Sequence, residues 1–297
     1  MSTKTNTISE YRLVRERVGM PTLNELRRAA GGHYLTLAAG LTHVVEDGEK
    51  DDPTVLLLHG ATVPHWEFDR LVPHLRANGS RTVRFDFLGH GLSDRPTVDY
   101  DFALFLRQAL EVLDGIHTSR PLTVLGHSFG AAIAAAVAHE RPSRVQRLVL
   151  VAPLLDFMAY SFWPRIFALP GVGSPLMRSI GLPALERRRQ RRYASIGAEH
   201  LTPRFIAEAR APGYTEALAS MFKKGTLSDQ QAHYQRLCQS ECEILVIAGT
   251  ADRVVPLQDV ERVRSMLPEH EYLELKGAEH ILLLTHPELV AAALIAQ

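Results

Sequence analysis

Short segments of mostly apolar residues alternate with helical patterns along most of this 297-residue chain, and this alternation limits the folds open to it. The apolar segments lie at 54–58, 82–87, 122–125, 148–152, 244–248 and 272–275. Strands that are apolar on both faces are typical of a parallel sheet covered by helices on both sides. Repeated strand–helix alternation therefore predicts an α/β fold with right-handed crossovers.

The other regular patterns fit the same fold. Two strand-like segments, 33–38 and 41–46, flank Gly40 and predict a hairpin ahead of the alternation. Within residues 1–32, apolar positions at helical spacing predict a helical extension that ends at Gly31-Gly32. The helical patterns that follow lie at 68–77, 102–115, 130–140, 257–266 and 287–296.

Residues 153–240 contain no convincing strand and so interrupt the alternation. The segment is too long for a plain connection, which predicts a helical insertion that forms a cap. Residues 153–235 hold 11 Lys and Arg against 6 Asp and Glu, a net charge of +5, while the rest of the chain carries −5. We therefore divide the chain into an N-terminal extension (1–32), a core (33–152 and 241–297) and a basic cap (153–240).

Composition excludes several classes of protein. Hydrophobic residues make up 46% of the chain and charged residues 22%, which argues against global disorder. The formal net charge is zero, whereas nucleic-acid binders usually carry a strongly basic domain. The two cysteines, Cys238 and Cys242, cannot build a disulfide framework or a four-cysteine zinc site. Because no secretory signal and no apolar run of membrane-span length is found, we expect a cytoplasmic protein without a metal centre.

Residues 126–130, Gly-His-Ser-Phe-Gly, fit the G-x-S-x-G pattern of a nucleophilic serine. The pattern has only three fixed positions and also fits an ordinary turn between a strand and a helix. Here an apolar strand precedes it and an alanine-rich helix follows it, which is the setting that a nucleophile turn requires. We therefore predict Ser128 as the nucleophile, with Gly126 and Gly130 allowing close packing around it.

A serine hydroxyl needs a base to remove its proton, and the base needs a carboxylate to orient it. In the fold that uses this nucleophile turn, the acid and then the histidine follow the serine along the chain. Asp252 and His280 each follow a predicted strand, at the end where open α/β sheets place their sites. We predict Asp252 as the acid and His280 as the base. Asp156, which follows the fourth apolar segment, ranks well below Asp252.

The reaction also needs hydrogen-bond donors for the negative charge that develops on the attacked oxygen. One predicted donor is the backbone N–H of Phe129, directly after the nucleophile. The other is expected in the loop after the first apolar segment, where Ala61 is our first choice and Thr62 the second.

Together these motifs resemble those of the α/β-hydrolase superfamily. The resemblance implies a doubly wound, mostly parallel sheet of about eight strands, with a helical cap after the sixth strand. Ser128 argues against the superfamily's haloalkane dehalogenases and epoxide hydrolases, whose nucleophile is Asp. The HGA and GHG segments look most like those of monoacylglycerol lipases and small carboxylesterases. The motifs are LLLHGA (56–61), FDFLGHGLSD (85–94), GHSFG (126–130), GTADRVVP (249–256), GAEH (277–280) and HPELV (286–290).

The start of the cap is rich in large apolar residues, which allow two interpretations. They are Phe157, Met158, Tyr160, Phe162, Trp163, Ile166 and Phe167. Packing of the cap onto the core is the simpler interpretation, because buried aromatic residues dominate cores. The other is a tunnel for an apolar or lipid-like acyl group, with a rim that faces a membrane. The arginine run at 187–192 would then contact anionic lipid, although such runs commonly form a solvated helix face.

The sequence thus predicts a hydrolase that cleaves a carboxylic ester of a small-molecule acyl substrate through an acyl-enzyme on Ser128, without a cofactor. The same triad also fits cleavage of an activated C–C bond, an amide or a lactone, or perhydrolysis with peroxide. The sequence does not separate these reactions, because they share the machinery and differ in the pocket. A non-catalytic ligand-binding protein of the same fold is an alternative of another class.

Overall fold

The computed structural model describes residues 23–118, 120–159 and 162–295. Eight strands form one sheet in the order β1-β2-β4-β3-β5-β6-β7-β8. They are β1 (His33–Leu37), β2 (Gly40–Asp47), β3 (Thr54–Leu58), β4 (Arg81–Phe85), β5 (Leu122–His127), β6 (Val145–Val151), β7 (Glu243–Gly249) and β8 (Glu271–Leu275). The pairs β1–β2 and β2–β4 are antiparallel, and every other neighbouring pair is parallel. The predicted α/β class and mostly parallel sheet are confirmed.

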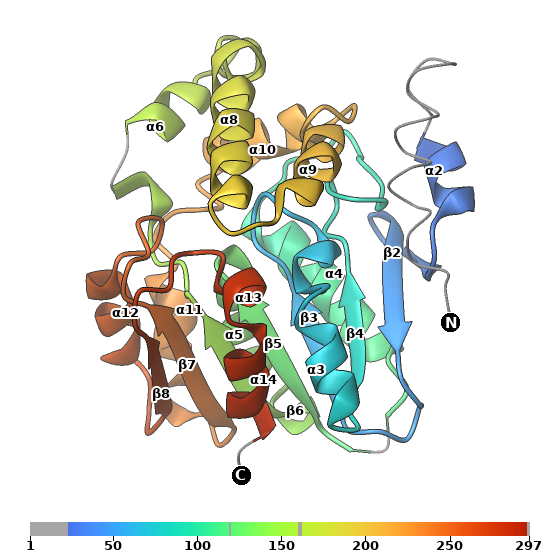
Figure 1. The fold of residues 1–297 in the computed structure, drawn as a ribbon, viewed down its shortest axis with the longest axis vertical. Helices are drawn as coiled ribbons and strands as arrows, with labels where there is room; N and C mark the ends of the chain where they lie inside the picture. The colour runs from blue at the N-terminus through green and yellow to red at the C-terminus, as the bar shows by residue number, and fades with distance from the viewer. Residues whose placement is uncertain (1–22, 119, 160–161, 296–297) are drawn as a thin grey trace.

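Helices cover both faces of the sheet. Along β3, Leu56 and Leu58 face the layer of α4 and α5, while Val55 and Leu57 face the layer of α3 and α14. All five residues of β3 are buried, as expected for a strand between two helical layers. In Figure 1, α3 and α14 lie on the near side of the sheet, with α4 and α5 behind it. These core helices are α3 (Val72–Ala77), α4 (Phe102–Gly115), α5 (Phe129–Glu140), α12 (Leu257–Arg264), α13 (Leu282–Thr285) and α14 (Pro287–Ile295).

Short helical elements account for the differences from the predicted pattern. The helix expected at 68–77 is divided into η1 (His65–Phe68) and α3, which begins next to Pro73. A proline is tolerated in the first helical turn because an N–H there would have no partner. The sequence patterns do not predict α13 or η2 (Pro142–Arg144), since three or four residues give no periodic signal. In the predicted N-terminal extension, α2 (Leu23–Ala29) is observed, and residues 1–22 lie outside the described residues.

The described residues between β6 and β7 form helices, most of which stand together at one end of the molecule (Figure 1). The last of them, α11 and η6, pack against α5 of the core. In the part of the chain that the structure describes, no helix is long and apolar enough to cross a bilayer. The elements are η3 (Phe157–Ala159), α6 (Trp163–Phe167), α7 (Gly173–Leu176), η4 (Met177–Gly181), α8 (Leu182–Ala194), η5 (Glu199–Leu201), α9 (Thr202–Ala209), α10 (Tyr214–Lys223), α11 (Gln231–Gln235) and η6 (Arg236–Gln239).

Candidate active site

The turn around Ser128 has the tight geometry that its glycines allow. Ser128 joins β5 to α5 with a φ of 55° and a ψ of −118°, a conformation that residues other than glycine rarely adopt. A Cβ at Gly126 would lie 2.1 Å from the carbonyl oxygen of Gly130, and a Cβ at Gly130 would lie 2.2 Å from that of Leu58. Both positions therefore require glycine, and the strand and helix meet at backbone contact distance.

The predicted nucleophile, base and acid come together beyond the carboxyl ends of β5, β8 and β7. The hydroxyl oxygen of Ser128 lies 3.1 Å from His280 Nε2, and His280 Nδ1 lies 2.8 Å from Asp252 Oδ2. The backbone N–H groups of Val254 and Val255 donate to the other oxygen of Asp252, at 2.7 and 2.9 Å. The acid thus holds the base, and the base faces the serine, as nucleophilic catalysis requires.

Burial and hydrogen bonding set the charges of the acid and the base. Burial is the largest influence on His280 and lowers its pKa, and the Asp252 carboxylate opposes this only in part. Burial alone would raise the pKa of Asp252, but His280 and the two backbone donors outweigh it, so this pKa is lowered. At neutral pH, Asp252 is a carboxylate and His280 a neutral imidazole that can accept a proton. Asp156, the second-ranked acid, accepts instead from the N–H of Met158 at 2.8 Å.

Within the described residues, the two N–H groups chosen as oxyanion donors have no hydrogen-bond acceptor. Phe129 is the first residue of α5, so its N–H has no partner within the helix. Among the described residues, the N–H of Ala61 donates no hydrogen bond. The loop of Ala61 is fixed by His59, whose Nε2 accepts from the N–H of Phe87 at 2.8 Å and whose Nδ1 donates to the carbonyl of Gly60 at 2.7 Å.

Two buried residues beside the triad are not singled out by the sequence analysis. Glu67 accepts from the N–H of Gly60 at 2.8 Å, and its second carboxylate oxygen lies 3.2 Å from His127 Nδ1. His127 Nε2 lies 3.0 Å from the carbonyl oxygen of His280. One signal in the sequence could have found Glu67: it stands between two large aromatic residues, and a charged side chain in such a segment is buried only when it is paired.

The cap contacts the loops of the site through α8 and α10. Arg189 donates to the hydroxyl of Thr62 at 2.8 Å, and the hydroxyl of Tyr214 donates to the carbonyl of Thr62 at 3.0 Å. Arg192 forms an ion pair with Glu279, next to the base, at 2.7 Å. Thr62, the second choice for an oxyanion donor, therefore serves as the cap's contact with the oxyanion loop.

Some of the apolar residues at the start of the cap fit the interpretation as core packing, and others do not. Phe157 packs against Phe222 of α10, as expected for contacts within a core. Phe162 and Trp163 stack on each other and are 59% and 43% exposed. Core packing therefore does not explain these last two, and Tyr160 of the same set lies outside the described residues.

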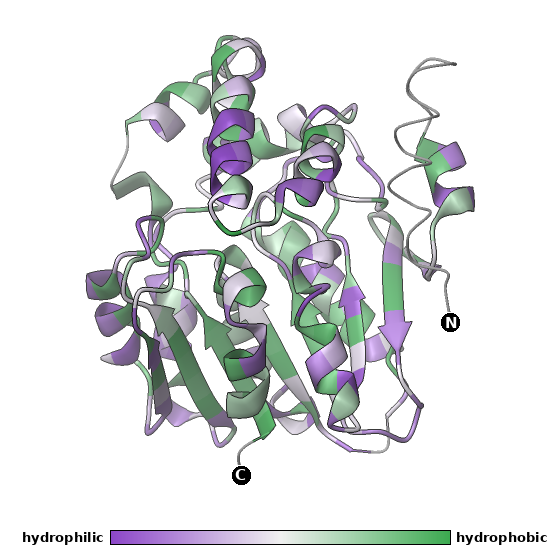
Figure 2. Cartoon of the chain, in the orientation of Figure 1, coloured by the Kyte–Doolittle hydropathy of each residue, from purple (hydrophilic) through white to green (hydrophobic). Residues whose placement is uncertain are grey.

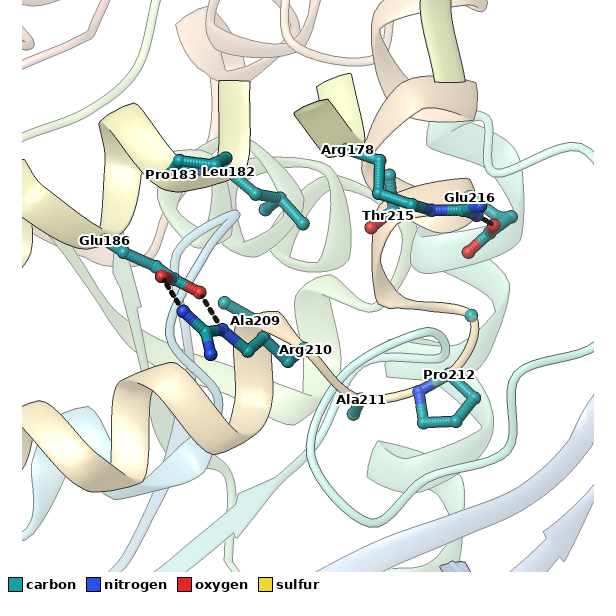
Figure 3. A pocket seen from close by; sticks show the side chains of 11 residues that line it. Arg178, Leu182, Pro183, Glu186, Ala209, Arg210, Ala211, Pro212, Thr215 and Glu216 are labelled. Atoms are coloured by element: carbon teal, nitrogen blue, oxygen red, sulfur yellow. Dashed lines mark hydrogen bonds and ion pairs between the residues drawn. The ribbon is translucent and has the colours of Figure 1, made fainter. Parts of the chain in front are cut away.

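A cavity of about 520 Å³ lies within the cap. Residues of α8, α10 and the connection between α9 and α10 line it, and Figure 3 shows the ion pair of Glu186 with Arg210, at 2.6 Å, among them. No triad residue lines this cavity, so it is not the place where Ser128 would meet a substrate.

His43, His65 and Asp86 bring three side chains close enough to hold a metal ion. The two oxygens of Asp86 already accept from His43 Nδ1 and His65 Nδ1, at 2.9 and 2.7 Å. They also accept from the backbone N–H groups of His65 and Leu92, both at 2.9 Å. Because these hydrogen bonds use the carboxylate fully, we interpret the group as a structural cluster that joins β2, η1 and the loop after β4.

Comparison with known proteins agrees with the fold. Residues 53–287 match the family described as the alpha/beta hydrolase fold. The chain belongs to the α/β-hydrolase family. As an α/β-hydrolase it is an enzyme of the hydrolase class, and the superfamily resemblance inferred from its motifs is confirmed.

Curated relatives of this α/β-hydrolase act on several kinds of bond. The chain is 29% identical over 233 residues to a 2-hydroxymuconate semialdehyde hydrolase of Pseudomonas sp. (strain CF600), covering 75% of this chain and 78% of that protein. It is 28% identical over 268 residues to haloalkane dehalogenase 2 of Mycobacterium bovis, covering 86% and 91%. Neither carries the name of a monoacylglycerol lipase, and that narrower resemblance stays a prediction.

Solved structures share the fold at low sequence identity. A hydrolase from Pseudomonas aeruginosa superimposes with a TM-score of 0.75 at 22% identity, covering 90% of this chain and 98% of that one. The enol-lactonase from Burkholderia xenovorans gives a TM-score of 0.73 at 20% identity, covering 89% and 98%. At such identities the likeness supports the α/β-hydrolase fold alone.

Proposed function

We propose that this α/β-hydrolase cleaves a carboxylic ester by nucleophilic attack of Ser128. The observation that supports it best is the unbroken chain of contacts from the Ser128 hydroxyl through His280 to Asp252. His280 Nε2 takes the hydroxyl proton as the serine oxygen bonds to the acyl carbon, while the N–H groups of Ala61 and Phe129 bind the oxygen that becomes negative. His280 then gives the proton to the leaving alcohol, and water activated by the same base releases the acid.

The acyl group of this ester is proposed to be apolar. A cavity of about 10 Å³ lies next to the triad, and its lining is apolar on one side, with Val63, Ile281, Leu283 and Leu284, and polar on the other, with Glu67, His127, Arg189 and Tyr193. Contact with the four apolar side chains would favour an acyl chain over a charged group, because burial of apolar surface stabilises by about 25 cal/mol per Å².

Hydrolysis of p-nitrophenyl esters from acetyl to palmitoyl tests both statements, with wild type and Ser128→Ala compared. Loss of the nucleophile is expected to lower kcat on the order of 10⁶-fold, and the rate should rise from acetyl to longer chains. A best rate on acetyl esters would contradict the apolar acyl group. Equal, feeble rates in both proteins would contradict ester hydrolysis and favour another bond, or a protein that binds its ligand without turnover.

A second candidate is cleavage of an activated C–C bond or a lactone in a substrate that carries a carboxylate. The observation that favours it is Arg189, whose guanidinium reaches the oxyanion loop at Thr62 and adds positive charge near His280. Relatives named as hydrolases of 2-hydroxymuconate semialdehyde and 2-hydroxy-6-oxo-2,4-heptadienoate point to the same class of acidic substrate.

Arg189→Met separates the two candidates, with Arg187→Met on the same helix as the matched control. If the natural substrate is acidic, kcat/KM for 2-hydroxy-6-oxo-2,4-dienoates should fall about 10- to 200-fold in Arg189→Met and not in Arg187→Met. This fall corresponds to the loss of one hydrogen bond to a charged group, about 1.5–3 kcal/mol. Neutral p-nitrophenyl esters should react at similar rates in all three proteins. Absence of any turnover of the dienoates by wild type would contradict this second candidate.

We also propose that the cap contacts an anionic lipid surface. Residues 162–195 contain seven arginines and a single acidic residue, Glu186, and Figure 2 shows hydrophilic residues along the middle of α8. Exposed aromatic residues beside arginines are typical of contact with a membrane interface. Five of the eight exposed large hydrophobic side chains among the described residues lie close together in the chain: Phe162, Trp163, Leu169, Val172 and Ile180.

The fluorescence of Trp163 reports such contact directly, because the chain's other tryptophan, Trp66, is buried. We expect a blue shift with vesicles that contain phosphatidylglycerol and none with phosphatidylcholine alone. Reversal of the charges at Arg187, Arg188 and Arg191 should abolish the shift, whereas Arg107→Glu on α4 should not. An equal shift with both kinds of vesicle, or none, would contradict the proposal.

A further inference from the structure

A buried ion pair adjoins the triad without belonging to it. The side chains of Glu67 and His127 are 9% and 6% exposed, and a carboxylate oxygen of Glu67 lies 3.2 Å from His127 Nδ1. Buried charges persist where they are paired and hydrogen-bonded. The remaining contacts of the pair therefore indicate what it does.

Those contacts reach three segments that are far apart in the sequence. The second oxygen of Glu67 accepts from the N–H of Gly60, in the oxyanion loop, at 2.8 Å. His127 directly precedes Ser128 in the nucleophile turn. His127 Nε2 lies 3.0 Å from the carbonyl oxygen of His280, in the loop that carries the base. One ion pair thus connects the three parts of the site that must stay aligned during the reaction.

The geometry also fixes the charge of His127. Both of its ring nitrogens face oxygen acceptors, so both must carry a proton. Burial alone would lower the pKa of His127, but the Glu67 carboxylate outweighs burial and raises it. The ring centre of this cation lies 4.9 Å from that of His280, whose pKa it helps to lower. Other titratable groups around the pair are His59 after β3, Arg189 and Tyr193 from α8, and Asp252 after β7.

We propose that Glu67 and His127 are positioning residues of this hydrolase. The pair holds the oxyanion loop, the nucleophile turn and the base-bearing loop together, and its positive end keeps His280 in the neutral form that accepts the serine proton. This inference rests on the serine mechanism proposed above. A merely structural pair would affect stability and would leave the pH dependence of the reaction in place.

Two single variants and their combination separate position from charge. Glu67→Gln keeps an acceptor for Gly60 but removes the counter-charge, so His127 loses the proton on Nδ1 and keeps only the one on Nε2 that it donates to the carbonyl of His280. We expect kcat on a p-nitrophenyl ester to fall up to about 10²-fold, with KM nearly unchanged. A fall of this size is the effect of displacing a reacting group by about 1 Å. His127→Asn should act in the same direction, and the double variant, which leaves no buried charge unpaired, guards against failure to fold.

The pH profile of kcat/KM tests the charge. In the double variant the cation beside His280 is gone, so the acidic limb should move to higher pH than in wild type. Glu208→Gln is the matched control, because Glu208 is also buried and also accepts from a backbone N–H, that of Gly91 at 2.8 Å. It should lower thermal stability without moving the pH midpoint.

Two further measurements distinguish failure of this proposal from failure of the serine mechanism. Nitrogen-15 histidine spectra should show His127 protonated on both nitrogens at pH 7 in wild type and on one in Glu67→Gln, whatever the protein hydrolyses. Fluorophosphonate labelling of wild type but not of Ser128→Ala supports the serine mechanism. If labelling occurs and the double variant keeps the wild-type kcat and pH midpoint, the positioning role is wrong. If wild type is not labelled, the serine mechanism fails, and the positioning role with it.

Discussion

Ser128 keeps a positive φ of 55° because the residues two positions before and after it have no side chain. The strain at the serine is tolerated because β5 and α5 pack in contact on either side of it. Each residue of the proposed triad has one role, and the groups around it set its position or its protonation state. The N–H groups of Val254 and Val255 hold the acid, the acid holds the base, and burial keeps the base neutral.

Gly126→Ala should both destabilise the protein and displace Ser128, the proposed nucleophile. The new methyl group would lie 2.1 Å from the carbonyl oxygen of Gly130, so backbone must shift. We expect a loss of roughly 1–3 kcal/mol in the free energy of unfolding, measured with urea, together with lower ester hydrolysis. Gly31→Ala is the control, because nothing lies within 4 Å of a Cβ there. Wild-type stability in Gly126→Ala would show that the turn is looser than described.

The pH dependence of kcat/KM should follow the lowered pKa of His280. The base works only when neutral, so activity should rise with pH through a midpoint below the ordinary histidine value of about 6.5 and then level off. Asp252→Asn should lower kcat about 10⁴-fold, because an amide no longer selects the correct tautomer of His280. The matched variant Asp156→Asn should leave kcat within a factor of a few. A midpoint above 7 in wild type would contradict the assigned environment of the base.

At the scale of elements, the site depends on how helices begin. The helix α5 starts directly after Ser128, the proposed nucleophile, and its first N–H groups point at the place where negative charge would develop. The helix α4 starts at Asp101, whose carboxylate accepts from the N–H of Leu104 at 2.8 Å. The helix α4 packs against α5, and Phe102 and Phe105 at its start contact the ring of Phe129, whereas the Asp101 carboxylate bonds to Leu104 rather than to the triad.

Asp101→Ala should therefore cost stability and leave the chemistry unchanged. Loss of an N-cap typically lowers the free energy of unfolding by about 0.5–2 kcal/mol. Asp101→Ser, which can still cap the helix, should restore most of that loss. Chemical denaturation and ester hydrolysis are to be measured on both variants. Equal stability of the alanine and serine variants would show that the cap contributes nothing.

At the scale of the whole molecule, the Asp86 cluster joins the antiparallel edge of the sheet to its parallel centre. Burial alone would raise the pKa of Asp86, but His65 and His43 hold it well below its usual value. Burial alone would lower the pKa of His43, but Asp86 raises it overall. The contribution of Asp86 to stability is present above the pKa that its carboxyl group has in the unfolded chain. It is lost as pH falls through the lower pKa of the folded protein. The contribution of His43 to stability is fully present below the pKa that its imidazole has in the unfolded chain. It is lost as pH rises through the raised pKa of the folded protein.

Asp86→Asn should destabilise the fold by about 3 kcal/mol, because it leaves buried donors without their charged acceptor. The loss should be larger at pH 5.5 than at pH 8, since His43 would have to give up its proton to fold in the variant. Asp114→Asn removes an exposed partner of Arg141 and should cost at most about 1 kcal/mol at either pH. Urea unfolding at the two pH values measures this. A loss that is the same at both would contradict the charged state of His43.

The sequence by itself determined the α/β class and the order of the strands along the chain, and it predicted Ser128, Asp252 and His280, which the structure brings together. Local patterns carry this information: apolar runs for buried strands, glycines around a tight turn, and site residues directly after strands. The tertiary structure decided what brings distant segments together. It placed Glu67 beside His127, seated Arg189 and Arg192 of the cap on the two site loops, and left Phe162 and Trp163 exposed. No local pattern encodes these contacts, because each depends on burial and charge pairing between residues far apart in the chain.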